Sequence, residues 1–277
     1  MINKTTFTDK IAAVRRQVKS HAPLIHCLTN HISINDCANV ILTVGAKPIM
    51  AEHPAEVADI TTAAKALVIN LGNISDTRMQ SMDIAGKTAQ AKGIPISIDL
   101  VGIACSTLRL AFAREFIATC KPAIIKGNIS ELKAFGGLAT FAKGIDASPE
   151  DMLTDHNAAE VFPFLKNLSQ RTGAVIAVTG KTDIVSDGQN IYLLANGCEM
   201  LSAITGTGCM INALAGAFLA GGAPLNAAIT ALALMAISGE LAAVETPGPA
   251  SFKISLLDNL FCLQPAELAA RLRLTVF

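Results

Sequence analysis

The chain has 277 residues, enough for one α/β domain with a large buried core. Its 22 Lys and Arg residues balance its 22 Asp and Glu residues, which argues against a basic tract for nucleic acid and against an acidic tail. Hydrophobic residues make up 51% of the chain with no Trp and one Tyr, so the core must be built from Ala, Ile, Leu and Val.

The predicted elements alternate between strand and helix through the first 180 residues. Short runs that are apolar through their centres predict strands, and stretches of helical pattern follow them. In chain order these are strand 23–28 and helix 34–45, strand 66–72 and helix 75–93, strand 95–102 and helix 107–120, strand 123–128 and helix 156–173, and strand 174–180. This alternation predicts an α/β fold of three layers, with a mostly parallel central sheet and helices on both faces.

The pattern changes after residue 180. Residues 183–197 predict a hairpin, with Asp187 and Gly188 in the turn. Residues 211–244 are strongly apolar, but the break at 221–224 divides them into two segments, the first too short to span a bilayer. We expect two buried helices there and no membrane partner. No linker interrupts the chain, so we expect a single domain over 1–277, with 138–155 as its most mobile loop.

The cysteine content predicts the compartment. Seven cysteines form no C-x-x-C pair, which favours free thiols in a reducing cytosol over a disulfide framework. The N-terminal segment MINKTTFTDK is polar and lacks the apolar core of a signal peptide. We therefore expect a cytoplasmic protein.

Polar residues follow several predicted strands at their carboxyl ends. Ligands bind at this edge of parallel sheets, so these residues are candidates for a site. They are Asn30, Asp99, Lys126, Asn128, Glu131, Thr179 and Gly180.

The stretch ITGTGC, residues 204–209, runs directly into an apolar helix. Consecutive amides of Gly206, Thr207 and Gly208 and of the first helical turn can point at one anion, and the helix dipole adds to the attraction. The stretch is neither a Walker loop nor a dinucleotide fingerprint. A helix start that needs small residues only for packing is the alternative. Cys209 is the unusual residue of this stretch.

These motifs resemble the ribokinase-like small-molecule kinases. Those kinases carry a G-x-G-D loop whose amides form an anion hole and whose Asp is the catalytic base, and an N-x-x-E motif that Asn128–Glu131 matches. One branch, the hydroxyethylthiazole kinase family, has Cys in place of that Asp, as this chain has Cys209. The stretches similar to that family are LTNHISINDCANVILTVGAKPIMAEHPAEV, VINLGN, KGNISE, VTGKTDIVSDG and ITGTGC, which together extend over most of the chain.

The resemblance implies a reaction and a set of roles. The reaction is the ATP-dependent phosphorylation of the hydroxyl of 4-methyl-5-(2-hydroxyethyl)thiazole, with Mg²⁺ as cofactor. The resemblance also implies a homotrimer with the thiazole sites at subunit contacts. The implied residues are Cys209 as base, the amides of 206–209 as anion hole, Asn30, Met50, Gly72 and Gly206 toward the thiazole, Lys126 and Thr179 toward ATP, and Asp99 and Glu131 toward the metal.

Two positions depart from the family pattern. Lys126 stands where the family usually has Arg, so a point charge replaces a bidentate fork. Residues 99–102 read Asp-Leu-Val-Gly where the family usually reads Asp-Pro-Val-Gly, which keeps the carboxylate of Asp99 but loosens its turn. Structural roles are the alternatives for several residues. Asp99 could cap a helix or join an ion pair, Glu131 could favour a first helical turn, and Met50 could fill the core.

The resemblance leaves a question about the base. A free thiol has a pKa of about 8.5 that a helix N-terminus lowers, so we expect Cys209 to have thiolate character near neutral pH. It would deprotonate the hydroxyl without forming a covalent intermediate.

The alternatives for the function of the protein are a kinase of another small alcohol such as hydroxymethylpyrimidine, an ATP-dependent dehydratase of hydrated nicotinamide nucleotides, and a non-catalytic nucleotide-binding module. The first two should keep Asp in the loop.

Overall fold

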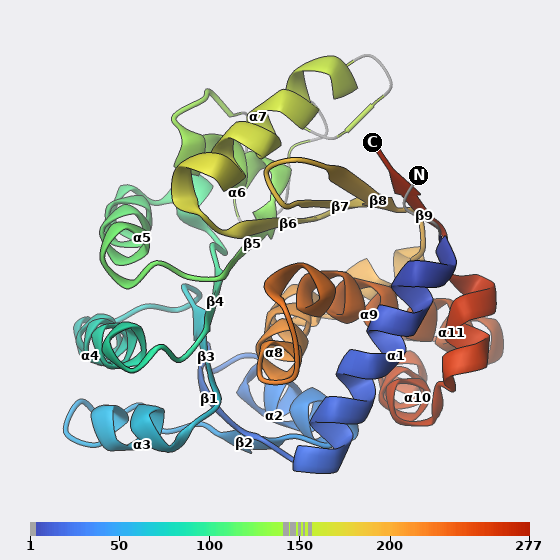
Figure 1. Cartoon of the computed structure of the whole chain (residues 1–277), viewed down its shortest axis with the longest axis horizontal. Helices are drawn as coiled ribbons and strands as arrows, with labels where there is room; N and C mark the ends of the chain where they lie inside the picture. Colours follow the sequence, from blue (N-terminus) through green and yellow to red (C-terminus); the bar gives the residue numbers. More distant parts are fainter. Residues whose placement is uncertain (1–3, 141–143, 145–147, 149–150, 152, 155–156) are drawn as a thin grey trace.

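The computed structural model describes residues 4–140, 144, 148, 151, 153–154 and 157–277. Most of the loop expected at 138–155 therefore lies outside the described residues. The described chain is built on one nine-stranded sheet in the order β2-β1-β3-β4-β5-β6-β7-β8-β9 (Figure 1). The strands from β2 to β6 are parallel, and β7, β8 and β9 are antiparallel additions at one edge. The mostly parallel sheet predicted from the sequence is confirmed.

The strands are short, and the first six lead their carboxyl ends to one edge of the sheet. Their bounds are β1 Leu24–Leu28, β2 Lys47–Ile49, β3 Ala66–Asn70, β4 Ile96–Asp99, β5 Ile124–Asn128, β6 Val175–Thr179, β7 Asp183–Ser186, β8 Ile191–Leu194 and β9 Leu274–Val276. The hairpin predicted at 183–197 is confirmed as β7 and β8, and Gly188 in its turn has a φ of 87°.

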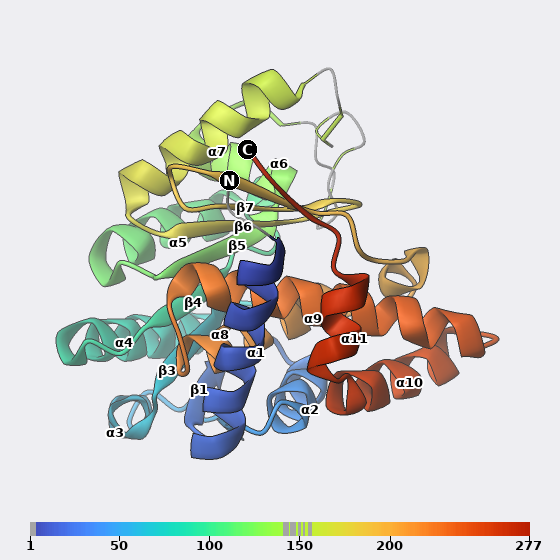
Figure 2. The same ribbon diagram turned by 45° about the vertical axis from the view of Figure 1, so that its right-hand side comes forward.

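Helices cover both faces of the sheet, which confirms the three predicted layers. One face carries α3 Val57–Ala63, α4 Asp76–Lys92, α5 Thr107–Cys120, α6 Ile129–Gly136 and α7 Ala158–Thr172 (Figure 1). The other carries α1 Lys4–His21, α2 Ile34–Thr43, α8 Thr207–Leu219, α9 Pro224–Glu245, α10 Pro249–Cys262 and α11 Pro265–Arg271 (Figure 2). Two short 3-10 helices, Ile103–Cys105 and Glu199–Ser202, complete the described elements.

Each layer of helices encloses its own core because successive side chains of a strand point to opposite faces. In β3, Ala66 and Val68 belong to the core under α8 and α9, whereas Leu67 and Ile69 belong to the core under α4 and α5. Every residue of β3 is buried. A strand covered on both faces is apolar throughout, which is why the continuous runs in the sequence predicted these strands.

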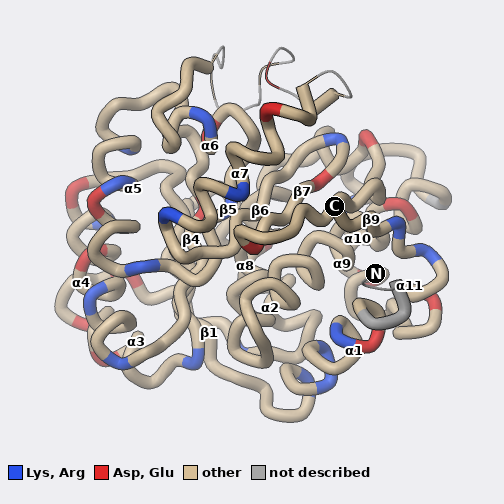
Figure 3. The backbone as a smooth tube through the Cα atoms, turned by 45° about the horizontal axis from the view of Figure 1, so that its top comes forward, with Lys and Arg blue, Asp and Glu red and all other residues tan. Residues whose placement is uncertain are grey.

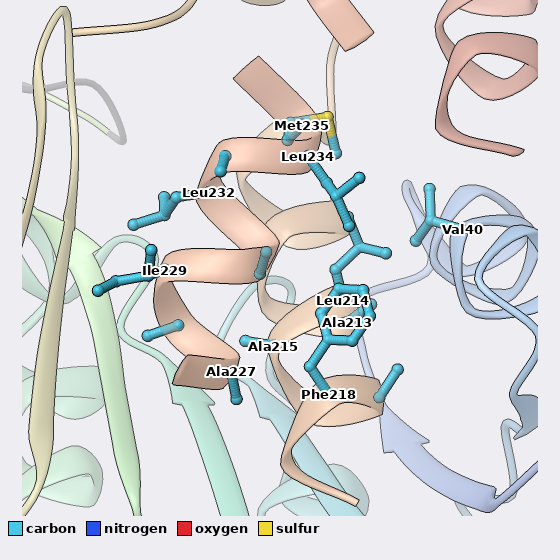
Figure 4. Close-up of a cluster of buried hydrophobic side chains, with 14 of the residues drawn as sticks. Val40, Ala213, Leu214, Ala215, Phe218, Ala227, Ile229, Leu232, Leu234 and Met235 are labelled. Carbon is cyan, nitrogen blue, oxygen red and sulfur yellow. The ribbon is translucent and has the colours of Figure 1, made fainter. Parts of the chain in front are cut away.

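The two most apolar helices, α8 and α9, pack against each other, and α8 also packs against α2. Figure 4 shows Leu214 and Phe218 of α8 on the same side as Leu234 of α9, with Val40 of α2 facing them, whereas Ile229 of α9 points to the opposite side. Helix α9 is long and apolar enough to cross a membrane by length and composition, but 78% of its most apolar window is buried inside the protein. It is therefore placed as a core helix, as expected. The charged residues lie mainly on the outer helices, where both signs are mixed (Figure 3).

Candidate active site

The N-terminus of α8 is open to an anion. Gly206 precedes the helix with a φ of 90°, a conformation that glycine adopts without strain. Among the described residues no side chain caps this helix start, and the hydroxyl of Thr207 donates to the carbonyl of Leu201 at 3.0 Å instead. The first amides of a helix have no intrahelical acceptor. The amides of residues 206–209 thus remain available to a phosphate group.

A buried asparagine fixes the position of α8 on the sheet. Asn212 lies one turn after Cys209 and is fully buried. Its Oδ1 accepts a 2.5 Å hydrogen bond from Ser97 on β4, and its Nδ2 donates to the carbonyl of Ile69 on β3 at 2.9 Å. If the helix slid along the sheet, both hydrogen bonds would break and leave buried polar groups unpaired. The two bonds therefore set the register of α8 against β3 and β4.

The sulfur of Cys209 ends a chain of side-chain amides. Asn30 Nδ2 donates to Cys209 Sγ at 3.1 Å and to Asn70 Oδ1 at 3.1 Å. Asn70 Nδ2 in turn donates to Asp99 Oδ2 at 3.1 Å. Both amide orientations are determined, because Asn30 Oδ1 accepts the N–H groups of Ile32 and Ser33 and Asn70 Oδ1 accepts that of Gly72. Residues from the ends of β1, β3 and β4 therefore meet at the start of α8.

Lys126 brings a positive charge to this point. Its Nζ lies 3.1 and 3.2 Å from the two carboxylate oxygens of Asp99, and both side chains are buried. A methyl group on Gly208 would lie only 2.9 Å from the same Nζ, so the ammonium lies beside the glycine-rich turn. Burial lowers the pKa of Lys126, but the charges of Asp99 and Glu131 outweigh it, so that the pKa is raised and the side chain stays charged.

Glu131 links the Asn128–Glu131 motif on β5 and α6 to the turn at residues 99–102 after β4. Its carboxylate accepts the N–H of Asn128 at 2.7 Å and the N–H of Gly102 at 2.8 Å. Asn128 Oδ1 accepts the N–H of Glu131 in return, which completes a capping box at the start of α6. Burial raises the pKa of Glu131 to about 7, and burial likewise raises the pKa of Asp99 against the opposing effect of Lys126. Both residues therefore also have the structural roles considered as alternatives: Asp99 forms an ion pair with Lys126, and Glu131 takes part in the cap of α6.

The expected lowering of the Cys209 pKa is wrong for the protein without ligands. Burial raises the pKa of the thiol, and the charge of Asp99 raises it further. The hydrogen bonds of Ser33 and Asn30 and the charge of Lys126 oppose this effect without cancelling it. The sequence shows the helix start but not the depth at which the sulfur lies. Desolvation of the charged form is the largest effect on this thiol.

The other predicted residues lie around this centre. The Cα of Gly72 faces Asn30 so closely that a methyl group there would be 3.0 Å from Asn30 Nδ2. Met50 follows β2 and is half-buried against the core under α8. Thr179 ends β6 and pairs in register with Asn128 on β5. The structure therefore joins Asn30, Gly72, Asp99, Lys126, Gly208 and Cys209 in one cluster, with Met50 and Thr179 on neighbouring strand ends.

Sequence reasoning missed two residues of this cluster. Asn70 is a polar residue at the carboxyl end of an apolar strand, the same signal that selected Asp99 and Asn30, and it could have been found in this way. Arg78 lies on the first turn of α4 and is 2% exposed. An arginine in a helix of mixed composition gives no sign of burial, so no sequence signal pointed to it.

The comparisons with known proteins agree with this geometry. A ribokinase-like superfamily protein from Enterococcus faecalis matches the fold with a TM-score of 0.64 at 12% identity, covering 90% of this chain and 93% of that one. At this identity the similarity shows the fold alone, a ribokinase-like α/β fold.

Relatives of higher sequence identity show which family the chain belongs to. The chain matches the hydroxyethylthiazole kinase family over residues 15–266, and it belongs to that family. Hydroxyethylthiazole kinase 2 of Clostridium botulinum strain Langeland is 49% identical over 264 residues, which cover 95% of this chain and 99% of the relative. The solved hydroxyethylthiazole kinase of Pyrococcus horikoshii matches with a TM-score of 0.86 at 31% identity, covering 97% of this chain and 99% of that one. The chain is thus a kinase that uses ATP as co-substrate.

Proposed function

We propose that this kinase phosphorylates the hydroxyl of 4-methyl-5-(2-hydroxyethyl)thiazole, and that the whole chain acts as one kinase domain. The observation that carries the proposal is the position of Cys209 at the anion-accepting start of α8, in contact with Asn30 from the end of β1. The curated relative at 49% identity bears the name of this activity over nearly its whole length. The thiazole would lie against Asn30, Met50, Gly72 and Gly206.

The chemistry is a transfer of the γ-phosphoryl group. The substrate oxygen forms a bond to the γ-phosphorus, the bond from that phosphorus to the bridging oxygen breaks, and ADP leaves. The amides of Gly206, Thr207, Gly208 and Cys209 would stabilise the charge on the transferred group as it develops. Lys126 supports this role, because its ammonium lies beside Gly208. Thr179 and Lys126 would contact ATP.

Cys209 would accept the proton of the hydroxyl. In phosphoryl transfer the attacking oxygen keeps its proton until late, so positioning contributes more than early base strength. A raised pKa makes the thiolate scarcer at neutral pH but a stronger base once formed. The N–H of Asn30 at 3.1 Å would stabilise that thiolate and hold the sulfur in place.

The residues present fit a magnesium ion. Two buried carboxyl groups, Asp99 and Glu131, lie near the Lys126 ammonium, and burial raises the pKa of both, so a bound cation would favour their ionised forms. Within the described residues, no group of three or more His, Cys, Asp or Glu side chains could hold a metal alone. Mg²⁺ commonly takes one or two carboxylates together with phosphate oxygens and water. Asp99 and Glu131 would hold it, directly or through water, and the ion would neutralise phosphate charge.

We also propose a homotrimer with thiazole sites at the subunit contacts, in the cytoplasm. Exposed apolar side chains support an interface beside the site: Ile32, two residues after Asn30, is 63% exposed, and Leu42 on α2 and Ile254 on α10 are also exposed. Helices α2 and α10 pack side by side. Mass photometry of the active protein tests this assembly, and a monomer with full activity would overturn it.

An assay over several alcohols tests the proposed reaction. The thiazole alcohol, hydroxymethylpyrimidine and a hydrated nicotinamide nucleotide are each incubated with ATP, and the products are identified by mass spectrometry. The expected result is phosphate on the thiazole alcohol with one ATP consumed for each product. Phosphorylation of the pyrimidine alone, dehydration of the nucleotide, or no turnover at all would each select one of the alternatives instead.

A further inference from the structure

Arg78 is a buried guanidinium that binds the backbone of two loops. Its Nη1 donates to the carbonyls of Gly72 at 2.6 Å and Asn73 at 2.8 Å. Its Nη2 donates to the carbonyl of Thr29 at 2.7 Å, with Asn70 O at 3.4 Å. These carbonyls lie at the carboxyl ends of β1 and β3. One planar fork therefore joins the loop that carries Asn30 to the loop that carries Gly72.

The same helix also reaches the loop that follows β2. Arg78 Nε has no hydrogen-bond partner in the described part of the chain, and its nearest charge is Glu52 Oε2 at 3.7 Å. Ser81, one turn further along α4, donates to the carbonyl of Glu52 at 2.6 Å. Glu52 lies two residues after Met50. The first turns of α4 thus contact three of the four loops on which thiazole-contacting residues are expected, those of Asn30, Met50 and Gly72.

We infer that Arg78 is a positioning residue for the alcohol substrate: it holds the loops after β1 and β3 in place and couples them to the Met50 loop through Glu52. The inference rests on the proposed function, since that proposal places the thiazole against Asn30, Met50 and Gly72. Asn73 has a φ of 48°, in the left-handed region that Asn adopts more readily than most residues, and Arg78 donates to its carbonyl. Preorganised loops lower the ordering cost that a ligand must otherwise meet.

The test distinguishes a positioning role from a folding role by whether KM for the alcohol or the apparent kcat changes. R78K keeps the charge but cannot bind carbonyls of both loops in one plane. We expect the KM for the thiazole alcohol to rise roughly tenfold, with kcat within about twofold and the KM for ATP unchanged. Partial unfolding would lower the apparent kcat without moving KM. R114K is the matched control, because Arg114 also donates to two carbonyls, those of Ala134 and Phe135, between α5 and α6.

The outcomes are distinct. An unchanged KM for the alcohol in R78K, or equal changes for both substrates, would overturn the positioning role while leaving the reaction established in the wild type. A wild type that does not phosphorylate the thiazole alcohol would instead refute the proposed function. If R78K does not fold, E52Q decides: it leaves the carbonyl bonds intact, and we expect a KM increase of about threefold. An unchanged KM in E52Q would then overturn the coupling to the Met50 loop.

Discussion

Removing the ammonium of Lys126 should destabilise the protein because it leaves Asp99 as an uncompensated buried charge. The side chains of Lys126 and Asp99 are 6% and 0% exposed, and Nζ lies 3.1 Å from Asp99 Oδ1. Breaking a buried pair by deleting one partner costs about 3–5 kcal/mol. Asn70 Nδ2 would remain the only side-chain donor to Asp99 among the contacts of the described residues. K126M should therefore lose about that much free energy of unfolding at pH 8.

The assay is urea unfolding at pH 8 of the wild type, K126M, D99N and the double variant K126M/D99N. The double variant removes both charges, so it should be more stable than K126M. The double-mutant cycle should therefore give a stabilising coupling energy between Lys126 and Asp99. The stability of K126M should also fall as pH rises above about 4, because Asp99 then loses a proton in the unfolded chain that the folded protein holds. If K126M costs as much free energy in the D99N background as in the wild type, the pairing is refuted.

Two further predictions concern packing and pH. G216A should lose about 1–3 kcal/mol of stability, since its methyl group would overlap Val68 Cγ2; G248A, which meets open space, is the control in thermal melts. Burial raises the pKa of Asp183 from 3.8 to about 7, so the folded protein binds a proton that the unfolded chain releases, and stability falls as pH rises through this range. D183N should abolish that fall and gain up to about 4 kcal/mol at pH 8; equal pH slopes in calorimetry of the two proteins would contradict it.

The core strands and the glycine-rich turn could be predicted because each leaves a local pattern. Continuous apolar runs predicted β1 and β3 to β6, and Asp187-Gly188 predicted the hairpin turn. Strands β2 and β9, with three residues each, were missed because so short a run has no periodicity to detect. Helix α3 of seven residues was missed for the same reason.

The site was only partly predictable, because burial and pairing depend on residues far apart in the chain. Strand ends and the turn indicated Asp99, Lys126 and Cys209, but the contact of Asn30 with Cys209 joins positions 179 residues apart. The pKa of the thiol was predicted in the wrong direction, because the helix start is visible in the sequence and the desolvation around the sulfur is not.

The most direct test of the account is kcat as a function of pH for the wild type, C209A and C209D with saturating thiazole alcohol and ATP. Because the pKa of the Cys209 thiol is raised by burial, we predict that wild-type kcat increases with pH above neutrality as the thiolate forms. C209D should remain active and lack that increase, since its carboxylate is ionised at lower pH, and C209A should lose most of its activity. Near-normal kcat in C209A, or a folded but inactive C209D, would contradict the role of Cys209 as the base.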